Sequence, residues 1–406
     1  MARDLLIGLY LLLFKGLFNL CKIFPTKDKV TFVVSFGENS LNVYEEMKKQ
    51  HITSEIVFLK KSSCSYDLET LTDAKVLQFE TRNIMDLVGS IYHLATSKHI
   101  LVDNYYGFLA SIEFKEDVQC IQLWHAAGAL KSFGLQDRSA KKRSSNAQNR
   151  FLNVYNKFDK VVVGSDEMAK IFMEAFALSS QAVLRTGVPR TDLFYNQELQ
   201  SEIIETLYKE NPILKMKKVI LYAPTYRDNE LDNFSLMLDL TKMHAELSEE
   251  YVLLIKLHPA IKNKAKQYEE EYPDFVYDYS SFNTINYLLL ITDILITDYS
   301  SIPYEYCLLN KPMVFFAYDI DTYQRTRGLP EDYHKQLPGP LVFNTTDVID
   351  TIKHNRFDLS LVEEFSKKWN RYSTGSSSKN LIQFLYNEQE ENQPILEQQK
   401  QQQQVL

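Results

Sequence analysis

The sequence lacks several patterns that mark common protein classes. Neither GxGxxG nor GxxxxGK[ST] occurs among its 406 residues, so a dinucleotide-dependent oxidoreductase and a P-loop ATPase are unsupported. The four cysteines, Cys21, Cys64, Cys120 and Cys307, form no CxxC pair, which argues against a disulfide framework or a zinc site and fits a reducing compartment. The net charge of -8 argues against a protein built to wrap nucleic acid.

The first 24 residues form a segment of their own. Residues 5–24 are apolar with polar interruptions, and on a helix the polar positions share one narrow face: Asp4, Gly8, Lys15, Asn19 and Lys22. Two lysines interrupt a run that would otherwise be long enough to span a membrane, and "CKIFPTK" is a poor signal-peptide cleavage site. We therefore predict a helix over residues 1–24 that lies in the membrane interface. A soluble helix packed on the body of the protein is the alternative.

After Pro25 the sequence alternates short apolar runs with helical stretches, and the same rhythm restarts after Pro212. This alternation is typical of parallel β-sheets with crossover helices. We predict an α/β protein with two Rossmann-like domains, residues 25–195 and residues 196–385. The tail, residues 386–406, is rich in Gln and Glu and is predicted to be disordered.

Polar side chains follow the predicted strands of both domains. Two facing Rossmann-like domains bind ligands in a cleft, outside the carboxyl ends of their strands. The residues that follow these strands are His125, Arg227, Lys256, His258, Asp298, Ser300 and Ser301. Lys256 alternates to the other side of its strand, and we interpret it as structural. Cations, and hydroxyls at helix starts, suit a diphosphate ligand.

A metal-binding D-x-D pair is missing from the predicted cleft. Asp319 and Asp321 have the right spacing but follow a late strand, and we interpret them as turn residues. The phosphates are therefore expected to be neutralised by side chains and backbone N–H groups, with no metal and no other cofactor.

Four segments carry a family resemblance, and they occur in the order "QLWHAAGALKSFG", "APTYRD", "LIKLHP" and "ITDYSSIPYEYCLLNKPMVFFAYDIDTYQRTRG". Together they resemble the CDP-glycerol glycerophosphotransferase family of teichoic acid synthesis, from about Lys29 to Lys379. The resemblance implies a GT-B-type fold and a peripheral position on the cytoplasmic side of the cell membrane. It also implies transfer of glycerol phosphate from CDP-glycerol to a polyprenyl-diphosphate-linked saccharide acceptor, with release of CMP.

The subtype rests on a departure from the family pattern. Many members have "WHG" followed by "TPLK" where this chain has "WHAAGALK". This departure and the single-module length are similar to the primases, which add the first glycerol phosphate. A CDP-ribitol-using or polymer-extending member stays open, as does a membrane-associated GT-B glycosyltransferase that uses a sugar nucleotide. Whether the chain forms a homo-oligomer also stays open.

His125 is the residue to which the resemblance assigns the general base. Histidine has a pKa suited to taking the proton of an acceptor hydroxyl as it attacks the β-phosphorus. We expect the small residues Ala126, Ala127 and Gly128 to leave room for the acceptor, and Lys131 to contact an acceptor phosphate. The alternative for His125 is a core histidine bonded to backbone.

The second-domain motifs are expected to bind the donor. Arg227 and His258 would donate to the diphosphate, and His258 could protonate the leaving phosphate. The alternative for Arg227 is a surface salt bridge with Asp228 or Asp232. Asp298 would orient His258 or hold the turn.

The helix start after "TDYSS" and the residues beyond it complete the predicted donor site. Ser300 and Ser301 would bind the diphosphate or cap the helix. Glu305 would either accept the ribose hydroxyls or be an exposed helix glutamate, and neither interpretation is favoured. Arg325 and Arg327 would reach the glycerol phosphate.

A basic cluster lies between the motifs, in "DRSAKKRSSNAQNR", and consists of Arg138, Lys141, Lys142, Arg143 and Arg150. A solvated loop is the usual explanation of such a run. Next to an acceptor site, it would instead face anionic lipid headgroups or the acceptor's diphosphate.

Overall fold

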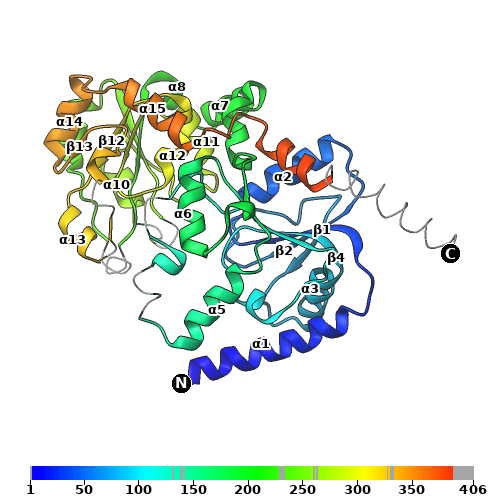
Figure 1. Cartoon of the computed structure of the whole chain (residues 1–406). Coiled ribbons are helices and arrows are strands. Elements are labelled where there is room, and N and C mark those ends of the chain that lie inside the picture. The colour runs from blue at the N-terminus through cyan, green and yellow to red at the C-terminus, as the bar shows by residue number, and fades with distance from the viewer. Residues whose placement is uncertain are drawn as a thin grey trace, which may run out of the picture. The chain divides into compact units, whose positions relative to one another are not determined.

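The computed structural model of the chain describes residues 2–129, 132–137, 140, 142–227, 234–258, 261, 264–326, 328–329 and 333–386 (Figure 1). The chain forms two compact units. The first unit comprises residues 1–125, 133–192 and 372–406, and the second comprises residues 126–132 and 193–371. The chain therefore leaves the first unit after His125, returns to it at Phe133, leaves it again after Asp192 and returns at Tyr372.

The first unit is built on a seven-stranded parallel sheet of order β3-β2-β1-β4-β5-β6-β7. Its strands are β1 Lys27–Val34, β2 Glu55–Lys60, β3 Lys75–Gln78, β4 Ser97–Val102, β5 Gln119–Gln122, β6 Lys160–Val162 and β7 Val183–Leu184. The central strand β1 is buried on both faces, as its run of Val and Phe residues predicts for a parallel sheet covered by helices.

Helices cover this sheet, and they are α1 Ala2–Cys21, α2 Glu38–Lys49, α3 Ile84–Thr96, α5 Ser145–Tyr155 and α6 Asp166–Phe176, with a short 3-10 helix η1 at Gly107–Ser111. Residues 377–386 are also helical, and their Leu381, Ile382 and Leu385 belong to the core formed by β1, β2 and α2. The Asp192 carboxylate accepts the backbone N–H groups of Ser377 and Ser378, both at 2.8 Å. Residues 377–386 thus belong to the first unit, whereas we predicted residues 196–385 as one C-terminal domain.

The second unit is built on a six-stranded parallel sheet of order β10-β9-β8-β11-β12-β13. Its strands are β8 Lys218–Ala223, β9 Tyr251–Ile255, β10 Val276–Asp278, β11 Ile294–Thr297, β12 Met313–Phe316 and β13 Leu341–Val342. Its helices are α7 Gln197–Glu210, α8 Ile213–Met216, α9 Leu240–Leu247, α10 Lys266–Glu271, α11 Ile285–Ile291, α12 Ile302–Tyr306, α13 Ile320–Thr326, α14 Thr345–Lys353 and α15 Leu359–Trp369. The two sheets confirm the predicted α/β class with two parallel-sheet domains.

Helix α1 is packed on the first unit along one face. Figure 1 shows it lying along the side of this unit, next to α3. Phe14 and Phe18 are buried, with ring centroids 5.1 Å from Phe108 and 5.9 Å from Phe114, respectively. The alternative expectation of a helix packed on the body of the protein is therefore met on this face.

The opposite face of α1 is apolar and open. It carries leucines that are 54 to 76% exposed: Leu5, Leu6, Leu9, Leu12, Leu13 and Leu20. By length and composition, residues 4–21 could cross a membrane, and α1 is the one described helix of which this holds. Successive residues of an α-helix are rotated by about 100°, which places these leucines roughly opposite to Phe14 and Phe18. Helix α1 therefore has a packed face and an exposed apolar face.

Candidate active site

An aspartate follows the corresponding strand of each sheet and fixes the loop of the neighbouring strand. In the first unit, Asp103 follows β4, and its carboxylate accepts the backbone N–H groups of Ser35, Phe36 and Gly37 at 2.8–3.1 Å. These residues follow β1, which pairs with β4. The hydroxyl of Tyr106 donates to the same carboxylate at 2.7 Å.

Asp298 has the same place in the second unit. It follows β11, and its carboxylate accepts the backbone N–H of Thr225 at 2.8 Å, in the loop after the paired strand β8. In its own turn, Asp298 Oδ1 also accepts the Tyr299 backbone N–H at 2.6 Å, and the predicted orientation of His258 stays a prediction. In both units the loops at the carboxyl edge are therefore fixed by a buried carboxylate, although neither loop has a glycine-rich motif.

His125 lies just beyond the end of β5, as predicted. Its Nδ1 atom is 3.0 Å from the backbone carbonyl oxygen of Asp103. Because a carbonyl can only accept, Nδ1 carries the proton, and Nε2 is the nitrogen that remains to take up another. The imidazole stacks on the ring of Phe36 at 4.0 Å and on that of Trp124 at 4.3 Å.

The surroundings of His125 keep it neutral. Burial lowers its pKa to about 4, the bond to the Asp103 carbonyl opposes this shift, and the positive charge of Arg190 adds to it. At pH 7 the ring is therefore a neutral imidazole with a defined tautomer. This is the protonation state that a general base requires.

The turn that carries His125 is held by side chains that we did not predict. Trp124 has a positive φ of 60°. The Asn39 side-chain amide donates to the carbonyl oxygens of Leu123 and Trp124 at 3.2 and 2.9 Å, and Arg190 Nη1 donates to that of His125. Asn39 follows the loop after β1, and Arg190 lies in "GVPRTD" at the end of the first unit's second segment. The one sequence signal that could have identified these two residues is that both lie shortly after a strand.

The small residues after His125 pack against a helix of the second unit. They begin the second unit and lie on α12. The Ala127 backbone N–H donates to Glu305 Oε1 at 2.9 Å, and a Cβ atom on Gly128 would lie 2.3 Å from the Tyr304 ring. Ala126 and Ala127 are themselves buried. Ala127 and Gly128 thus pack closely on α12, which accounts for their small size, and the room for an acceptor stays a prediction.

Glu305 is buried, with an exposed fraction of 3%. Its interpretation as an exposed helix glutamate is therefore wrong. The predicted contact with ribose hydroxyls stays a prediction, and such a contact would share the carboxylate with the Ala127 N–H.

Arg227 is a buried arginine that joins two aspartates of the second unit. Its guanidinium donates twice to Asp319, at 2.9 Å from both Nε and Nη2, and Asp298 Oδ2 lies 3.0 Å from Nη1 and from Nη2. Nη1 also donates to the Thr225 carbonyl. All five N–H donors of an arginine are thereby used within the protein, and the surface salt bridge that we considered names residues outside the described ones.

The rings and charges around Arg227 keep it protonated. Its guanidinium carbon lies 4.9–5.5 Å from the ring centroids of Tyr299, Tyr318 and Tyr323. Burial alone would lower its pKa, but the hydrogen bond to Asp319 and the charge of Asp298 raise it. A contact of Arg227 with the diphosphate stays a prediction, and it would require one of these hydrogen bonds to open.

The two serines after β11 differ in their contacts. Ser300 Oγ accepts the Ile302 backbone N–H at 3.2 Å, so this hydroxyl helps to start α12. Ser301 occupies the N-cap position, but its side chain makes no capping bond. Its hydroxyl is therefore the one that does not serve as a helix cap.

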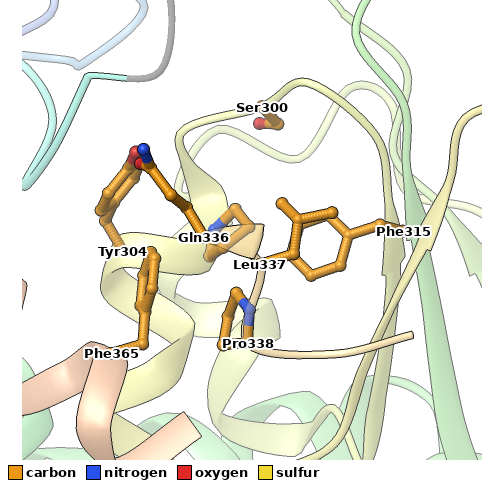
Figure 2. A pocket seen from close by; sticks show the side chains of 8 residues that line it. Ser300, Tyr304, Phe315, Gln336, Leu337, Pro338 and Phe365 are labelled. Atoms are coloured by element: carbon orange, nitrogen blue, oxygen red, sulfur yellow. The ribbon is translucent and has the colours of Figure 1, made fainter. Parts of the chain in front are cut away.

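Ser300 also stands at the rim of a mostly apolar pocket, which Figure 2 shows between α12, the segment before β13, and α15. The pocket is lined by Ser300, Pro303, Tyr304, Phe315, Gln336, Leu337, Pro338 and Phe365.

The remaining predicted residues lie on the surface or outside the description. His258 is exposed after β9, and its ring centroid is 4.4 Å from that of Tyr226. Arg325 is exposed on α13, where it donates to Thr322 at 3.2 Å. Arg327 and Lys131 lie outside the described residues.

Part of the predicted basic cluster is also described. Lys142 and Arg143 are exposed, whereas Arg138 and Lys141 lie outside the described residues. Arg150 lies 3.5 Å from Asp4 of α1. Within the described part of the chain, no group of three or more His, Cys, Asp or Glu side chains could hold a metal ion.

Comparisons with known proteins agree on one family. The model of the CDP-Glycerol:Poly(glycerophosphate) glycerophosphotransferase family matches residues 17–387. The chain is 36% identical over 386 residues to the teichoic acid glycerol-phosphate primase of Bacillus subtilis (strain 168), covering 95% of this chain and 98% of the primase. It is 35% identical to the teichoic acid poly(ribitol-phosphate) polymerase of Bacillus spizizenii (strain ATCC 23059 / NRRL B-14472 / W23), covering 93% of this chain but 60% of the polymerase.

Solved structures agree on the fold. The wall teichoic acid polymerase TagF superposes with a TM-score of 0.78 at 22% identity, covering 96% of this chain and 99% of that chain. A UDP-GlcNAc 2-epimerase from Neisseria meningitidis has a TM-score of 0.55 at 17% identity, covering 88% and 99%. At these identities the likeness concerns the fold alone.

Proposed function

Because the chain belongs to the CDP-glycerol:poly(glycerophosphate) glycerophosphotransferase family, we propose that it acts as a primase on a polyprenyl-diphosphate-linked saccharide. It is an enzyme of teichoic acid synthesis that transfers glycerol phosphate from CDP-glycerol. The proposed acceptor hydroxyl attacks the β-phosphorus, and CMP leaves. The observation that carries the proposal is the near end-to-end match with a glycerol-phosphate primase.

His125 is proposed as the general base. The acceptor O–H loses its proton to Nε2 while its oxygen forms a bond to the β-phosphorus. The bond from that phosphorus to the oxygen of CMP breaks, and the electron pair leaves with CMP. The hydrogen bond from Nδ1 to Asp103 supports this role, because it presents the unprotonated nitrogen without any proton transfer beforehand.

The donor is proposed to bind at the carboxyl edge of the second sheet. Ser300 and Ser301 contact its diphosphate at the start of α12, Glu305 its ribose, and Arg325 its glycerol phosphate. His258 is exposed beyond β9 and can supply a proton to the leaving CMP. Arg227 supports this edge by holding Asp298, which in turn holds the loop after β8.

The enzyme is further proposed to lie on the cytoplasmic side of the cell membrane, with α1 in the interface. The exposed leucines of α1 supply apolar area for the acyl-chain boundary. Ile84 and Met85 are 72% and 82% exposed at the start of α3, which packs beside α1. The exposed Lys142 and Arg143 would meet anionic headgroups, and a membrane position brings the enzyme to a lipid-linked acceptor.

A CDP-ribitol donor is the second candidate, because a poly(ribitol-phosphate) polymerase is 35% identical over 387 residues. The test is a comparison of CDP-glycerol, CDP-ribitol and UDP-GlcNAc by thermal shift and by release of the nucleotide with a polyprenyl-diphosphate-linked saccharide. Release of CMP from CDP-glycerol alone supports the proposal. Equal release from CDP-ribitol, or turnover of UDP-GlcNAc, contradicts it.

A further inference from the structure

We propose that Asn39 and Arg190 are positioning residues that hold the turn at Trp124 and thereby aim the imidazole of His125. The inference rests on the proposed base role of His125. Both residues lie in the first unit with His125, so their contacts with this turn lie within one compact unit.

The turn before His125 has a backbone conformation that needs external support. Trp124 has φ of 60°, in the left-handed region that a bulky residue rarely adopts. Its backbone N–H donates to Gln122 Oε1 at 2.9 Å. Conformations of this kind persist where the surroundings over-determine them, and they cluster at functional sites.

Asn39 holds this turn through hydrogen bonds of both its amide nitrogen and its amide oxygen. It is 2% exposed. Its Nδ2 donates to the carbonyl oxygens of Leu123 and Trp124, at 3.2 and 2.9 Å, and its Oδ1 accepts the backbone N–H of Arg190 at 2.9 Å. An amide has two N–H donors and a carbonyl acceptor, so each polar atom of Asn39 has a partner. An aspartate of the same shape cannot donate to either carbonyl.

Arg190 takes the next carbonyl along the chain. Its Nη1 donates to the backbone oxygen of His125, and its Nη2 lies 2.7 Å from Glu38 Oε2. The Arg190 and Glu38 side chains are 11% and 15% exposed, so this ion pair is largely buried. The carbonyls of Leu123, Trp124 and His125 are thus held in succession by two side chains, in the segment after β5 has ended.

These contacts act on the imidazole through the backbone that carries it. The Nδ1–Asp103 bond forms only if the His125 backbone has the right place and direction. Release of the turn would let the ring leave Asp103, after which either nitrogen could carry the proton. Loss of a defined Nε2 acceptor would lower the rate of the chemical step. Donor affinity should be unaffected, because the donor is proposed to bind in the other unit.

The test compares Asn39→Asp with Asn42→Asp. Asn42 is a matched control on the same helix, because its amide donates to Glu38 O within α2 at 2.9 Å. We expect Asn39→Asp to lower kcat by about 10²-fold, as a misplacement near 1 Å does, with little change in KM for CDP-glycerol. We expect Asn42→Asp to leave both constants near their wild-type values.

The tautomer of His125 gives a readout that a merely structural role would not move. In protein labelled with ¹⁵N-histidine, the His125 signals are assigned by their loss in His125→Asn. Wild type and Asn42→Asp should show an Nδ1–H tautomer, and Asn39→Asp should show a mixture. Arg190→Lys keeps the positive charge but loses the planar guanidinium with its several N–H donors, so it should give the same mixture of tautomers. This variant replaces Asn39→Asp in the test if Asn39→Asp does not fold.

The double variant separates failure of this inference from failure of the proposed function. If Asn39 acts through His125, adding Asn39→Asp to His125→Asn should lower kcat no further. Wild-type kcat and an unchanged tautomer in folded Asn39→Asp and Arg190→Lys would overturn the positioning role, even if His125→Asn is inactive. Full activity of His125→Asn would instead overturn the base role, while the tautomer shift would still report the positioning.

Discussion

The Nδ1 atom of His125 lies 3.0 Å from the backbone carbonyl oxygen of Asp103, and this contact joins two strand ends of the first unit. The Asp103 carboxylate at the same time holds the loop after β1. Asp103 therefore fixes both the loop after β1 and the tautomer of the proposed base. Through Tyr106, which donates to Asp103 and has its ring 6.1 Å from that of Phe108, the contacts continue to Phe14 of α1.

Replacement of the proposed base should slow the chemical step without weakening donor binding. We expect His125→Asn to lower kcat by about 10²–10⁴-fold, the usual contribution of general-base catalysis. Its affinity for CDP-glycerol, measured by calorimetry, should match wild type, because the donor is proposed to bind the second unit. A kcat within about tenfold of wild type would contradict a contribution of that size.

The pH dependence of kcat should reflect the lowered pKa of His125. A base acts in its unprotonated form, and burial lowers the pKa of His125 to about 4. The rate should therefore stay constant as the pH falls past 6.5, the ordinary pKa of histidine, and decline only toward the lowered value. An acid limb centred near 6.5 would show that the ring is solvated during the reaction.

Stability provides the control for this profile. Because the pKa of His125 is lower in the folded state, its contribution to stability is present above its unfolded pKa and is lost as the pH falls through about 4. Circular dichroism at each pH should show a folded protein wherever kcat is interpreted.

Arg227→Ala should unfold the second unit more readily. The substitution leaves the buried carboxylate of Asp298 and the half-buried carboxylate of Asp319 without their cation. Breaking a buried ion pair costs roughly 3–5 kcal/mol, which chemical denaturation can measure. If Arg227→Ala kept wild-type stability but lost more affinity for CDP-glycerol than for CMP, the result would support a contact of Arg227 with the diphosphate over a purely structural role.

The two faces of α1 should separate under substitution. Replacing the exposed Leu9, Leu12 and Leu13 by Gln should reduce sedimentation with anionic vesicles and leave the denaturation midpoint unchanged. Phe14→Ala should instead lower the free energy of unfolding by roughly 3–5 kcal/mol, because it removes a buried ring.

Deletion of residues 1–24 would confound these effects, because it removes both the buried rings and the exposed leucines. If the Leu-to-Gln variant sedimented like wild type at high salt, the exposed face would not be the membrane contact.

Gly128→Ala should disturb the segment that follows His125. The added Cβ would lie 2.3 Å from Tyr304 Cδ1, too close for any real contact. We expect a lower melting temperature and a lower kcat. Gly16→Ala is the matched control, since a Cβ there meets nothing within 4 Å, and unchanged melting of Gly128→Ala would contradict the close packing on α12.

The sequence by itself determined the α/β class, the doubling of the parallel sheet and the place of His125 at a strand end. Hydrophobic periodicity and turn residues are local signals, and each strand of a parallel sheet carries its own. The motifs around His125, Arg227, His258 and Asp298 also carried the family, because their order along the chain is preserved.

Only the tertiary structure decided which side chains act together. Asn39, Asp103, His125 and Arg190 are far apart in the sequence. They follow β1, β4, β5 and β7, and the order β1-β4-β5-β6-β7 of the parallel sheet brings these strand ends to one edge. The same holds for Arg227, whose carboxylate partners follow other strands and whose neighbours Asp228 and Asp232 suggested a surface role. Polar partners in a folded protein are chosen by sheet order and burial, since a buried charge must find its partner wherever the fold supplies one.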